Sequence, residues 1–414
     1  MSIIPAIAVN QNIENHPIGE NETVVPVFIY LSASASTFSS KLQLVADYDP
    51  LSVFVKSLIN KQPITNNALK LYFDNGGGPC FVYEMPYTAE LINVTSQTDY
   101  ASLLAPLLQQ PEITLLAVTD LQLLDVVKDD DKTGKNYAAF WTHLLEAVAV
   151  RKDIFCLIDA PASIAACKAF KAAMGKVNTS FAAAYWPHLV CDYPVNATLT
   201  PSEWAILPPS PAVAAVMYKT DRDVGIWKAP ANLEIEHIVS PQFDMSYGDD
   251  VFTDDEPASK TSRLNYILSF AGFGTRIWGC RTLQSDATKG MLYIQQRRLM
   301  TFIERNMREL ANFMMFEPNN EMTWYKYKGV ANDWLRQLWK SGGLFGDSEE
   351  QAWKLEMGLN ETMTVEDIKH GIIRITISVK ILNPVEFIDL KLTLSINQPT
   401  ALVNSGLQQY EVSQ

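Results

Sequence analysis

Residues 291–316 read MLYIQQRRLMTFIERNMRELANFMMF, and their apolar side chains recur at the spacing of one helix face. That face comprises Leu299, Ile303, Met307, Leu310 and Met314. Glu304 lies four residues before Arg308, which is the favourable order for an ion pair along a helix. We expect the helix to end before Pro318, because proline cannot extend it.

Two further helices are predicted directly after this one. The first covers residues 322–340, and Ser341-Gly342-Gly343 stops it. Its buried stripe comprises Tyr327, Ala331, Trp334, Leu335 and Leu338. The second is short and starts at Ser348, because Ser348-Glu349-Glu350-Gln351 has the spacing of a capping box.

Two runs farther along the sequence alternate between apolar and polar side chains, as half-buried strands do. Residues 373–381 read IRITISVKI, and residues 387–396 read FIDLKLTLSI. Pro384 lies between the runs and lacks the N–H group that a continuous ladder needs. We therefore predict two separate strands, each with one face to bury.

Two strands alone are marginally stable in water, so these runs require further partners. One interpretation is an ordinary hairpin within the chain, which is the commoner arrangement. The other is that the second run adds to an exposed sheet edge of a neighbouring copy. Each main-chain hydrogen bond gained there contributes roughly 0.5–1.5 kcal/mol net. The residues alone leave both interpretations open.

The first half of the chain alternates strands with helices, which is typical of a small α/β domain with a partly parallel sheet. The predicted strands are residues 24–31, 80–85, 113–119, 154–158 and 212–218, and the predicted helices are residues 47–58, 137–150 and 162–174, with residues 68–73 as the end of a further helix. Residues 1–23 are polar and lack a core of their own, so they form either an arm or a disordered terminus.

The composition is that of a globular protein of 414 residues, which is long enough for two or more domains. The net charge of −13 argues against a nucleic-acid binder that works by neutralising phosphates. Five scattered cysteines without a CxxC pair favour reduced thiols and synthesis in a reducing cytoplasm. We expect no signal peptide and no membrane insertion, because no basic N-terminal region or long apolar run is present.

Two patterns suggest chemistry but lack the spacing of a known site. Asn75-Gly76-Gly77-Gly78 lies between a predicted helix and a predicted strand, and no Lys-Ser/Thr follows it. We expect it to cap the helix rather than to cradle a phosphate. His188, Cys191 and Asp192 lie close in sequence but match no nucleophile motif.

Two acidic runs, Asp129–Asp131 and Asp249–Glu256, raise the possibility of cation binding. The second run lacks the spacing and the glycine of a calcium-binding EF-hand loop. We expect both to be solvated loops. The sequence thus predicts no catalytic residues, no cofactor and no metal site.

Seven segments, in this order along the chain, resemble those of contractile tail sheath proteins, which occur in phage tails and phage-tail-like injection particles. Two lie upstream, LYFDNGGGPCFVYEM (71–85) and PSPAVAAVMYKTDRDVGIWKAPAN (209–232). Five lie downstream, FGTRIWGCRTL (273–283), YIQQRRLMTFIERNM (293–307), FEPNNEMTW (316–324), LRQLWKSGGLFG (335–346) and ITISVKILNPVEFIDLKLTLSI (375–396). The resemblance covers most of the chain and favours strand exchange over the internal hairpin.

The resemblance implies a multi-domain α/β (α+β) fold with an α/β N-terminal half, a helix-plus-sheet C-terminal domain and extended terminal arms. The expected parts are an N-terminal arm (1–23), one or more α/β sheath domains (24–240), the C-terminal sheath domain (241–386) and a C-terminal arm and tail (387–414). The arms are expected to lie on neighbouring subunits. The interface residues expected there are Ile4, Ile7, Val9, Ile13, Ile375, Ile377, Val379, Ile381, Phe387, Ile388, Leu390, Leu392, Leu394 and Ile396.

The implied function is structural and not enzymatic. The subunit would polymerise around an inner tube and contract to drive that tube through a target envelope. Expected partners are further copies in hexameric rings or a helix, sheath paralogues, an inner tube protein and a baseplate. The particle would assemble in the bacterial cytoplasm and act as a released particle or part of a virion.

Contact with the inner tube is expected through the charged face of the helix predicted at 322–340. The residues proposed for this contact are Lys326, Lys328, Arg336 and Lys340. Two alternatives to a main sheath subunit stay open at this point. One is a baseplate-proximal or terminal cap protein of the same particle, and the other is an α/β enzyme with an unrecognised site.

Overall fold

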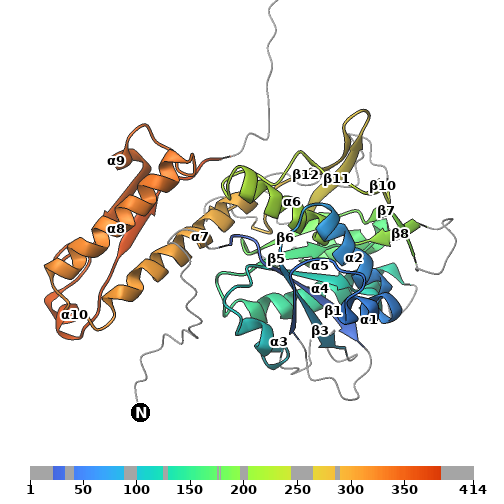
Figure 1. Cartoon of the computed structure of the whole chain (residues 1–414), viewed down its shortest axis with the longest axis horizontal. Helices are drawn as coiled ribbons and strands as arrows, with labels where there is room; N and C mark the ends of the chain where they lie inside the picture. Colours follow the sequence, from blue (N-terminus) through green and yellow to red (C-terminus); the bar gives the residue numbers. More distant parts are fainter. Residues whose placement is uncertain are drawn as a thin grey trace, which may run out of the picture. The chain divides into compact units, whose positions relative to one another are not determined.

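The computed structural model describes residues 22–32, 42–87, 100–124, 129–174, 177, 179–195, 204–243, 264–284 and 290–383. These residues form a large mixed sheet covered by helices, a small three-stranded sheet, and a helical block that carries a two-stranded sheet (Figure 1). The α/β class predicted from the sequence is confirmed.

Nine strands form the large sheet, in the order β2-β3-β1-β4-β5-β6-β11-β12-β9. The bounds are β1 Pro26–Ser32, β2 Leu42–Val45, β3 Cys80–Pro86, β4 Leu115–Asp120, β5 Phe155–Asp159, β6 Ala182–Trp186, β9 Leu233–Glu234, β11 Leu264–Phe270 and β12 Gly274–Trp278. Neighbours from β3 to β11 in this order are parallel, whereas β2, β12 and β9 pair antiparallel at the two ends. Helical crossovers between the strands account for the parallel centre.

Helices cover both faces of the large sheet, because successive side chains of a strand point to opposite faces. In β1, Val27 and Ile29 pack with the core of α3, α4 and α5, whereas Phe28 and Tyr30 pack with that of α1, α2 and α6. The helix bounds are α1 Val53–Lys61, α2 Pro63–Asp74, α3 Tyr100–Leu108, α4 Asp130–Val148, α5 Ile164–Met174 and α6 Ser210–Asp223. A strand buried on both faces reads as one apolar run, as predicted for residues 24–31.

The strand predicted at residues 212–218 is wrong, because these residues lie within α6. Every residue from Ala212 to Met217 is buried, so the run lacks the polar positions that reveal a helical period. Asp159, at the end of β5, binds the start of this helix. Its Oδ1 accepts the Ser210 N–H at 2.8 Å, and its Oδ2 accepts the Ser210 hydroxyl at 2.5 Å.

Two helices start at other residues than predicted. Asp129 caps α4 by accepting the Lys132 N–H at 3.3 Å, so the acidic run Asp129–Asp131 begins a helix and is not a loop. Carboxylates at this position also interact favourably with the helix dipole. Helix α1 begins at Val53 and not at residue 47, because the Ser52 side chain caps it.

The glycine run after α2 has the role predicted for it. Gly76 has φ +83°, a left-handed conformation that favours glycine. The Gly77 N–H donates to the Tyr72 carbonyl at 3.0 Å, which closes the end of the helix. The run is therefore a helix cap before β3.

The helical block contains α7 Ile294–Leu310, a short 3₁₀ helix Ala311–Met314, α8 Glu321–Lys340, α9 Glu349–Ala352 and α10 Val365–Lys369. The two long helices confirm the sequence prediction. Their predicted apolar stripes pack together in one core, which also contains Trp353 and Met357. Ser348 precedes α9 as predicted, but its hydroxyl makes no capping bond.

The first half of α7 contacts the α/β part of the subunit through two arginines. Arg298 pairs with Asp221 of α6 at 2.6 Å, and both side chains are 4% exposed. The Arg297 guanidinium lies 4.5 Å from the centre of the Phe181 ring. Arg297 also pairs with Glu304 at 3.3 Å, so the ion pair predicted between Glu304 and Arg308 is wrong.

The predicted division of the chain at residue 240 stays a prediction. Strands β11 and β12 follow that residue and belong to the large sheet, whereas α7 and α8 build a separate core. The predicted arms, 1–23 and 387–414, lie outside the described residues except for Glu22 and Thr23.

Candidate subunit interface

The helical block carries an antiparallel sheet of two strands, β13 Trp353–Glu356 and β14 Thr376–Val379. Side chains alternate along β14 and its flanks, so that every second one faces the core of α7 and α8. The predicted interface residues Ile375, Ile377, Val379 and Ile381 are all half-buried against that core. These side chains pack within the subunit, and the backbone edge is the part open to a neighbour.

The register identifies which backbone groups of β14 face away from β13. Leu355 lies opposite Ile377, and the Lys380 N–H donates to the Ala352 carbonyl at 2.9 Å. Bonded and non-bonded pairs alternate in an antiparallel ladder, so the backbone groups of Ile377 and Val379 point to the outer edge. No described strand pairs with that edge. An extended segment with free N–H and C=O groups could add there as a further strand.

The other predicted interface residues lie outside the described residues. They are Ile4, Ile7, Val9, Ile13, Phe387, Ile388, Leu390, Leu392, Leu394 and Ile396. Strand β13, the described partner of β14, is absent from the sequence prediction. Trp353 is buried and Lys354 exposed, which is the alternation of a strand, but four residues directly after a predicted helix are too few to stand out.

The four residues predicted to contact an inner tube all lie on α8, and two have partners within the subunit. Lys328 pairs with Glu361 at 3.1 Å. Arg336 pairs with Asp333 at 2.5 Å and holds Glu349 through two bonds of 2.6 and 3.0 Å. The hydrogen bond from Arg336 lowers the pKa of the Glu349 carboxyl.

Lys326 and Lys340, the other two predicted contact residues, are exposed and have no ion pair with a described residue. The predicted contact face of α8 is therefore a mixture of paired and unpaired charges.

A glycine lies in the middle of the exposed side of α8. A Cβ added at Gly329 would meet no atom within 4 Å. Glycine in a helix interior costs about 1 kcal/mol relative to alanine. Met322 and Tyr325, each 69% exposed, precede it on the same side of the helix. Nothing in the described subunit requires a glycine here, and its absence of a side chain opens the helix backbone to close approach by another molecule.

The structure separates the residues that first suggested a nucleophile. The Nε2–H of His188 donates to the Ala160 carbonyl at 3.1 Å, and burial lowers the pKa of this imidazole to about 4. Burial raises the pKa of the Cys191 thiol to about 12, so it stays protonated. Asp192 pairs with His237 at 3.1 Å. These groups do not form a nucleophile and base in contact.

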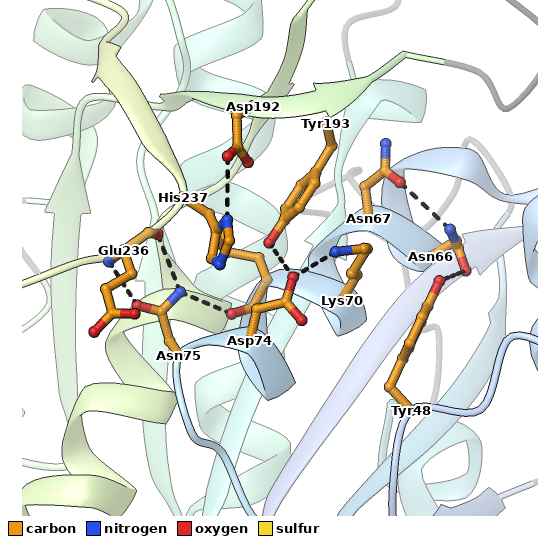
Figure 2. Close-up of polar contacts among 11 residues, drawn as sticks. Tyr48, Asn66, Asn67, Lys70, Asp74, Asn75, Asp192, Tyr193, Glu236 and His237 are labelled. Carbon is orange, nitrogen blue, oxygen red and sulfur yellow. Dashed lines mark hydrogen bonds and ion pairs between the residues drawn. The ribbon is translucent and has the colours of Figure 1, made fainter.

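Figure 2 shows the polar network around the contact between Asp192 and His237, which joins α2 to the small sheet of β7 Leu189–Pro194, β8 Trp204–Leu207 and β10 Ile238–Pro241. Asp74 accepts bonds from Lys70 at 2.5 Å and from the Tyr193 hydroxyl at 2.6 Å. The Asn75 side chain bonds both backbone groups of Glu236, at 2.8 and 3.2 Å. These contacts tie the helix end to two neighbouring segments, which is a structural role.

Within the described ranges, no three His, Cys, Asp or Glu side chains gather closely enough to hold a metal ion. None of the described helices combines the length and the apolar character needed to span a membrane. The most distinctive feature for function is thus the incomplete sheet on the helical block.

Comparison with known proteins shows what this block is similar to. Residues 286–395 match the model of the phage tail sheath C-terminal domain, a range that contains α7, α8 and the β13–β14 sheet. A search of curated proteins found no match to the chain.

Three solved structures are similar over almost the whole chain. A chain of the contracted anti-feeding prophage (AFP) baseplate is 27% identical, covers 95% of this chain and 99% of its own, and has a TM-score of 0.76. A chain of the contracted AFP helical sheath is 26% identical, with coverages of 95% and 99% and a TM-score of 0.68. A chain of the contracted PVC sheath complex, from an extracellular contractile injection system, is 25% identical, with coverages of 96% and 99% and a TM-score of 0.68. The resemblance to contractile tail sheath proteins is confirmed.

Proposed function

We propose that this chain is the repeating structural subunit of a contractile sheath that polymerises around an inner tube. The observation that carries this proposal is the open edge of β14, on a block that matches the tail sheath C-terminal domain. Similarity to chains of two contracted sheaths, over at least 95% of this chain, supports it. The matched family is structural, and we assign no catalytic role to any residue.

Strand exchange through the terminal arms would join the copies. Residues 387–396 alternate apolar and polar side chains, so a strand formed by them could pair with the outer edge of a neighbour's β14 and turn its apolar side toward the α7–α8 core. The N-terminal arm, with Ile4, Ile7, Val9 and Ile13, would supply a further strand. Each hydrogen bond adds only roughly 0.5–1.5 kcal/mol, but several along one edge make a durable link.

Contact with the inner tube would occur through the exposed side of α8. Lys326 and Lys340 are unpaired among the described residues, whereas Lys328 and Arg336 already hold carboxylates. Exposed ion pairs each contribute little, about 0–1 kcal/mol, which suits a sheath that must release its tube on contraction. Gly329 would let the tube approach the helix backbone.

Contraction would be a rigid-body rearrangement of subunits in which the strand links hold. The extended sheath would be a metastable state whose energy is stored during assembly and released from the baseplate end. The rings are proposed to be hexameric. Assembly would take place in the bacterial cytoplasm, and the particle would act outside the cell or as part of a virion.

A baseplate-proximal or terminal protein of the same particle is the second candidate. Chains of two AFP baseplate structures are among the similar structures, with TM-scores of 0.68 and 0.76, beside the two sheath chains at 0.68, so structural similarity leaves both candidates open. Such a protein would form one ring at an end of the tube and no long cylinder.

Co-expression with the inner tube protein of the same particle, followed by negative-stain electron microscopy, distinguishes the candidates. Long hollow cylinders around tubes are expected for a main sheath subunit. Single rings at tube ends would identify the second candidate. A small closed oligomer that does not bind tubes would contradict both candidates and would support the α/β enzyme instead.

A further inference from the structure

A pocket of about 300 Å³ lies between residues 150–153, which follow α4, and one side of α7. Its charged lining residues are Arg151, Lys152, Asp153, Glu304, Arg305 and Arg308. Figure 1 shows where α4 and α7 lie in the subunit. The volume equals that of about ten water molecules, which is enough for one or two carboxylate side chains.

The acidic groups of this pocket are already engaged within the subunit. Asp153 accepts two bonds from Arg151, at 2.8 and 2.9 Å. Glu304 pairs with Arg297, which lies outside the pocket, at 3.3 Å. Neither carboxylate is therefore available to compensate the remaining cations at contact distance.

Three cations of the pocket, Lys152, Arg305 and Arg308, have no ion pair with any residue that the structure describes. Glu112 and Glu309 act on Arg305 only through longer-range electrostatics. In a chain whose net charge is −13, this pocket, lined by four cations and two carboxylates, is a local concentration of positive charge. Side chains of this kind bind carboxylates and phosphates.

Arg305 is the least exposed of the three cations. Its Nη2 donates to the Pro111 carbonyl at 2.9 Å. Burial lowers the pKa of the Arg305 guanidinium, and the neighbouring Arg151 lowers it further although Asp153 opposes the shift. Arginine stays charged at physiological pH, so an anion placed beside Arg305 would stabilise a charge that is partly withdrawn from water.

We propose that this pocket binds the acidic segment Asp249–Glu256 of a neighbouring copy. The segment reads DDVFTDDE and carries five carboxylates in eight residues, and it lies outside the described residues. Copies of so acidic a chain repel one another, and a local meeting of opposite charges both offsets that repulsion and sets the register between neighbours. The inference rests on the proposed function, because it places the contact within an assembled sheath.

A carboxylate-rich segment fits the pocket better than nucleic acid does. Nucleic-acid binding relies on neutralising several phosphates along a backbone, whereas here three cations line one pocket in a strongly acidic chain. Free phosphate shares the charge but lacks the length of the segment. The experiment below therefore includes it as a competitor.

A synthetic peptide of residues 246–259, SYGDDVFTDDEPAS, tests the contact on the soluble subunit. We expect the fluorescence anisotropy of the labelled peptide to report binding to the wild-type chain. The affinity should fall at least tenfold for Lys152→Glu/Arg308→Glu. Lys56→Glu/Lys168→Glu is the matched control, because both residues are exposed on α1 and α5 and the net charge changes equally.

The control variant should bind the peptide as the wild-type chain does. A peptide with the five acidic residues replaced by Asn and Gln should not bind. Equal loss in both double variants, no binding by the wild-type chain, or full displacement by millimolar inorganic phosphate would each contradict a dedicated site for this segment.

A charge exchange then tests whether the contact joins two copies. One variant is Lys152→Glu/Arg308→Glu, and the other replaces Asp249, Asp250, Asp254 and Asp255 by Lys. Each alone should fail to polymerise where the wild-type chain forms cylinders, and an equal mixture of both should polymerise again. Recovery only when all changes are in one chain would place the contact within a subunit and overturn the proposal.

Unchanged polymerisation of the pocket variant would also overturn this inference. A wild-type chain that forms no cylinders or rings contradicts the proposed function instead, and the peptide experiment still decides whether the pocket binds the segment. The two failures are therefore distinguishable.

Discussion

The large sheet and the β13–β14 sheet differ in how much of each is covered within the subunit. In the large sheet, helices cover both faces, and strands such as β1 and β5 are buried along their whole length. The β13–β14 sheet has two strands, a half-buried apolar face and an outer edge on β14 that no described strand occupies. The first sheet has both faces covered within one chain, whereas the outer edge of β14 in the second can bind a further strand.

This contrast separates the stability of the subunit from its ability to assemble. Apolar burial in the large sheet stabilises the folded subunit, because the stabilisation scales with the apolar area removed from water. In the proposed assembly, the open edge would supply main-chain hydrogen bonds that form only between copies. Changes in the two regions should therefore affect different measurements.

Removal of residues 387–414 should have the largest effect on assembly. We expect a soluble, folded subunit that forms no cylinders, because the segment proposed to occupy the open edge of β14 is missing. Circular dichroism reports folding, and negative-stain microscopy reports polymers. Cylinders formed by the truncated chain would show that the C-terminal arm does not link the copies.

Ile377→Pro should also abolish polymerisation, because it removes an N–H group that points to the outer edge of β14. Ile377→Ala is the matched control, since it removes the same apolar side chain and keeps the N–H group. Sedimentation of polymers measures both. Equal polymerisation of the two variants would mean that the outer edge takes no part in assembly.

Phe140→Ala should destabilise the subunit by about 3–5 kcal/mol, because Phe140 is fully buried in the core of α3, α4 and α5. Ile377→Ala should cost only about 1–2 kcal/mol, because its side chain is half-exposed. Urea denaturation of the unassembled subunit measures both values. Similar losses would show that the two regions contribute equally to folding, contrary to the contrast drawn above.

Asp159→Asn should change how the stability of the large sheet depends on pH. Burial raises the pKa of the Asp159 carboxyl from 3.8 to about 7, although bonds from Ser210 oppose the shift. Between these values the folded chain holds a proton that the unfolded chain releases. The stability of the wild-type chain should therefore fall as pH rises through this window, by up to about 1.4 kcal/mol per unit.

The asparagine side chain introduced by this substitution cannot titrate, so the difference between wild type and Asp159→Asn isolates the contribution of the carboxyl. Urea denaturation at several pH values from 4 to 7.5 measures it. The wild-type chain should lose stability relative to the variant as pH rises, and parallel curves would contradict the assignment.

Gly329→Ala should have the smallest effect on stability. It should raise the stability of the subunit and weaken its assembly. The unassembled subunit should gain about 1 kcal/mol, because alanine favours the helix and meets no atom at this position. Assembly on inner tubes should weaken if the tube approaches this side of α8. Denaturation and co-sedimentation with tubes measure the two effects, and a gain in stability with unchanged tube binding would exclude Gly329 from the contact.

Much of the helical block could be predicted from the sequence, because α7 and α8 each bury one face and expose the other. Their apolar residues recur at helical spacing, and Pro318 and Ser341-Gly342-Gly343 mark their ends. The apolar alternation in residues 373–381 likewise identified the region of β14. A strong hydrophobic period can be recognised in the sequence without knowing which elements pack beside it.

Elements buried on every side could not be predicted in the same way. Helix α6 was expected to be a strand because Ala212–Met217 has no exposed position to reveal a period. Strand β13 has four residues, and only its pairing with β14 makes it recognisable. The pairing of Arg298 with Asp221 of α6 depends on how α7 packs against the α/β part, which local sequence does not contain.

The sequence by itself determined the α/β class, the two long helices and the alternating strand, because these depend on periodic burial within short stretches of chain. Only the tertiary structure decided that β14 pairs with β13 and leaves its outer edge open, and that Lys152 lines the same pocket as Arg305 and Arg308 of α7. Those features join residues far apart in the chain. Their positions follow from the packing of whole elements and not from local preference.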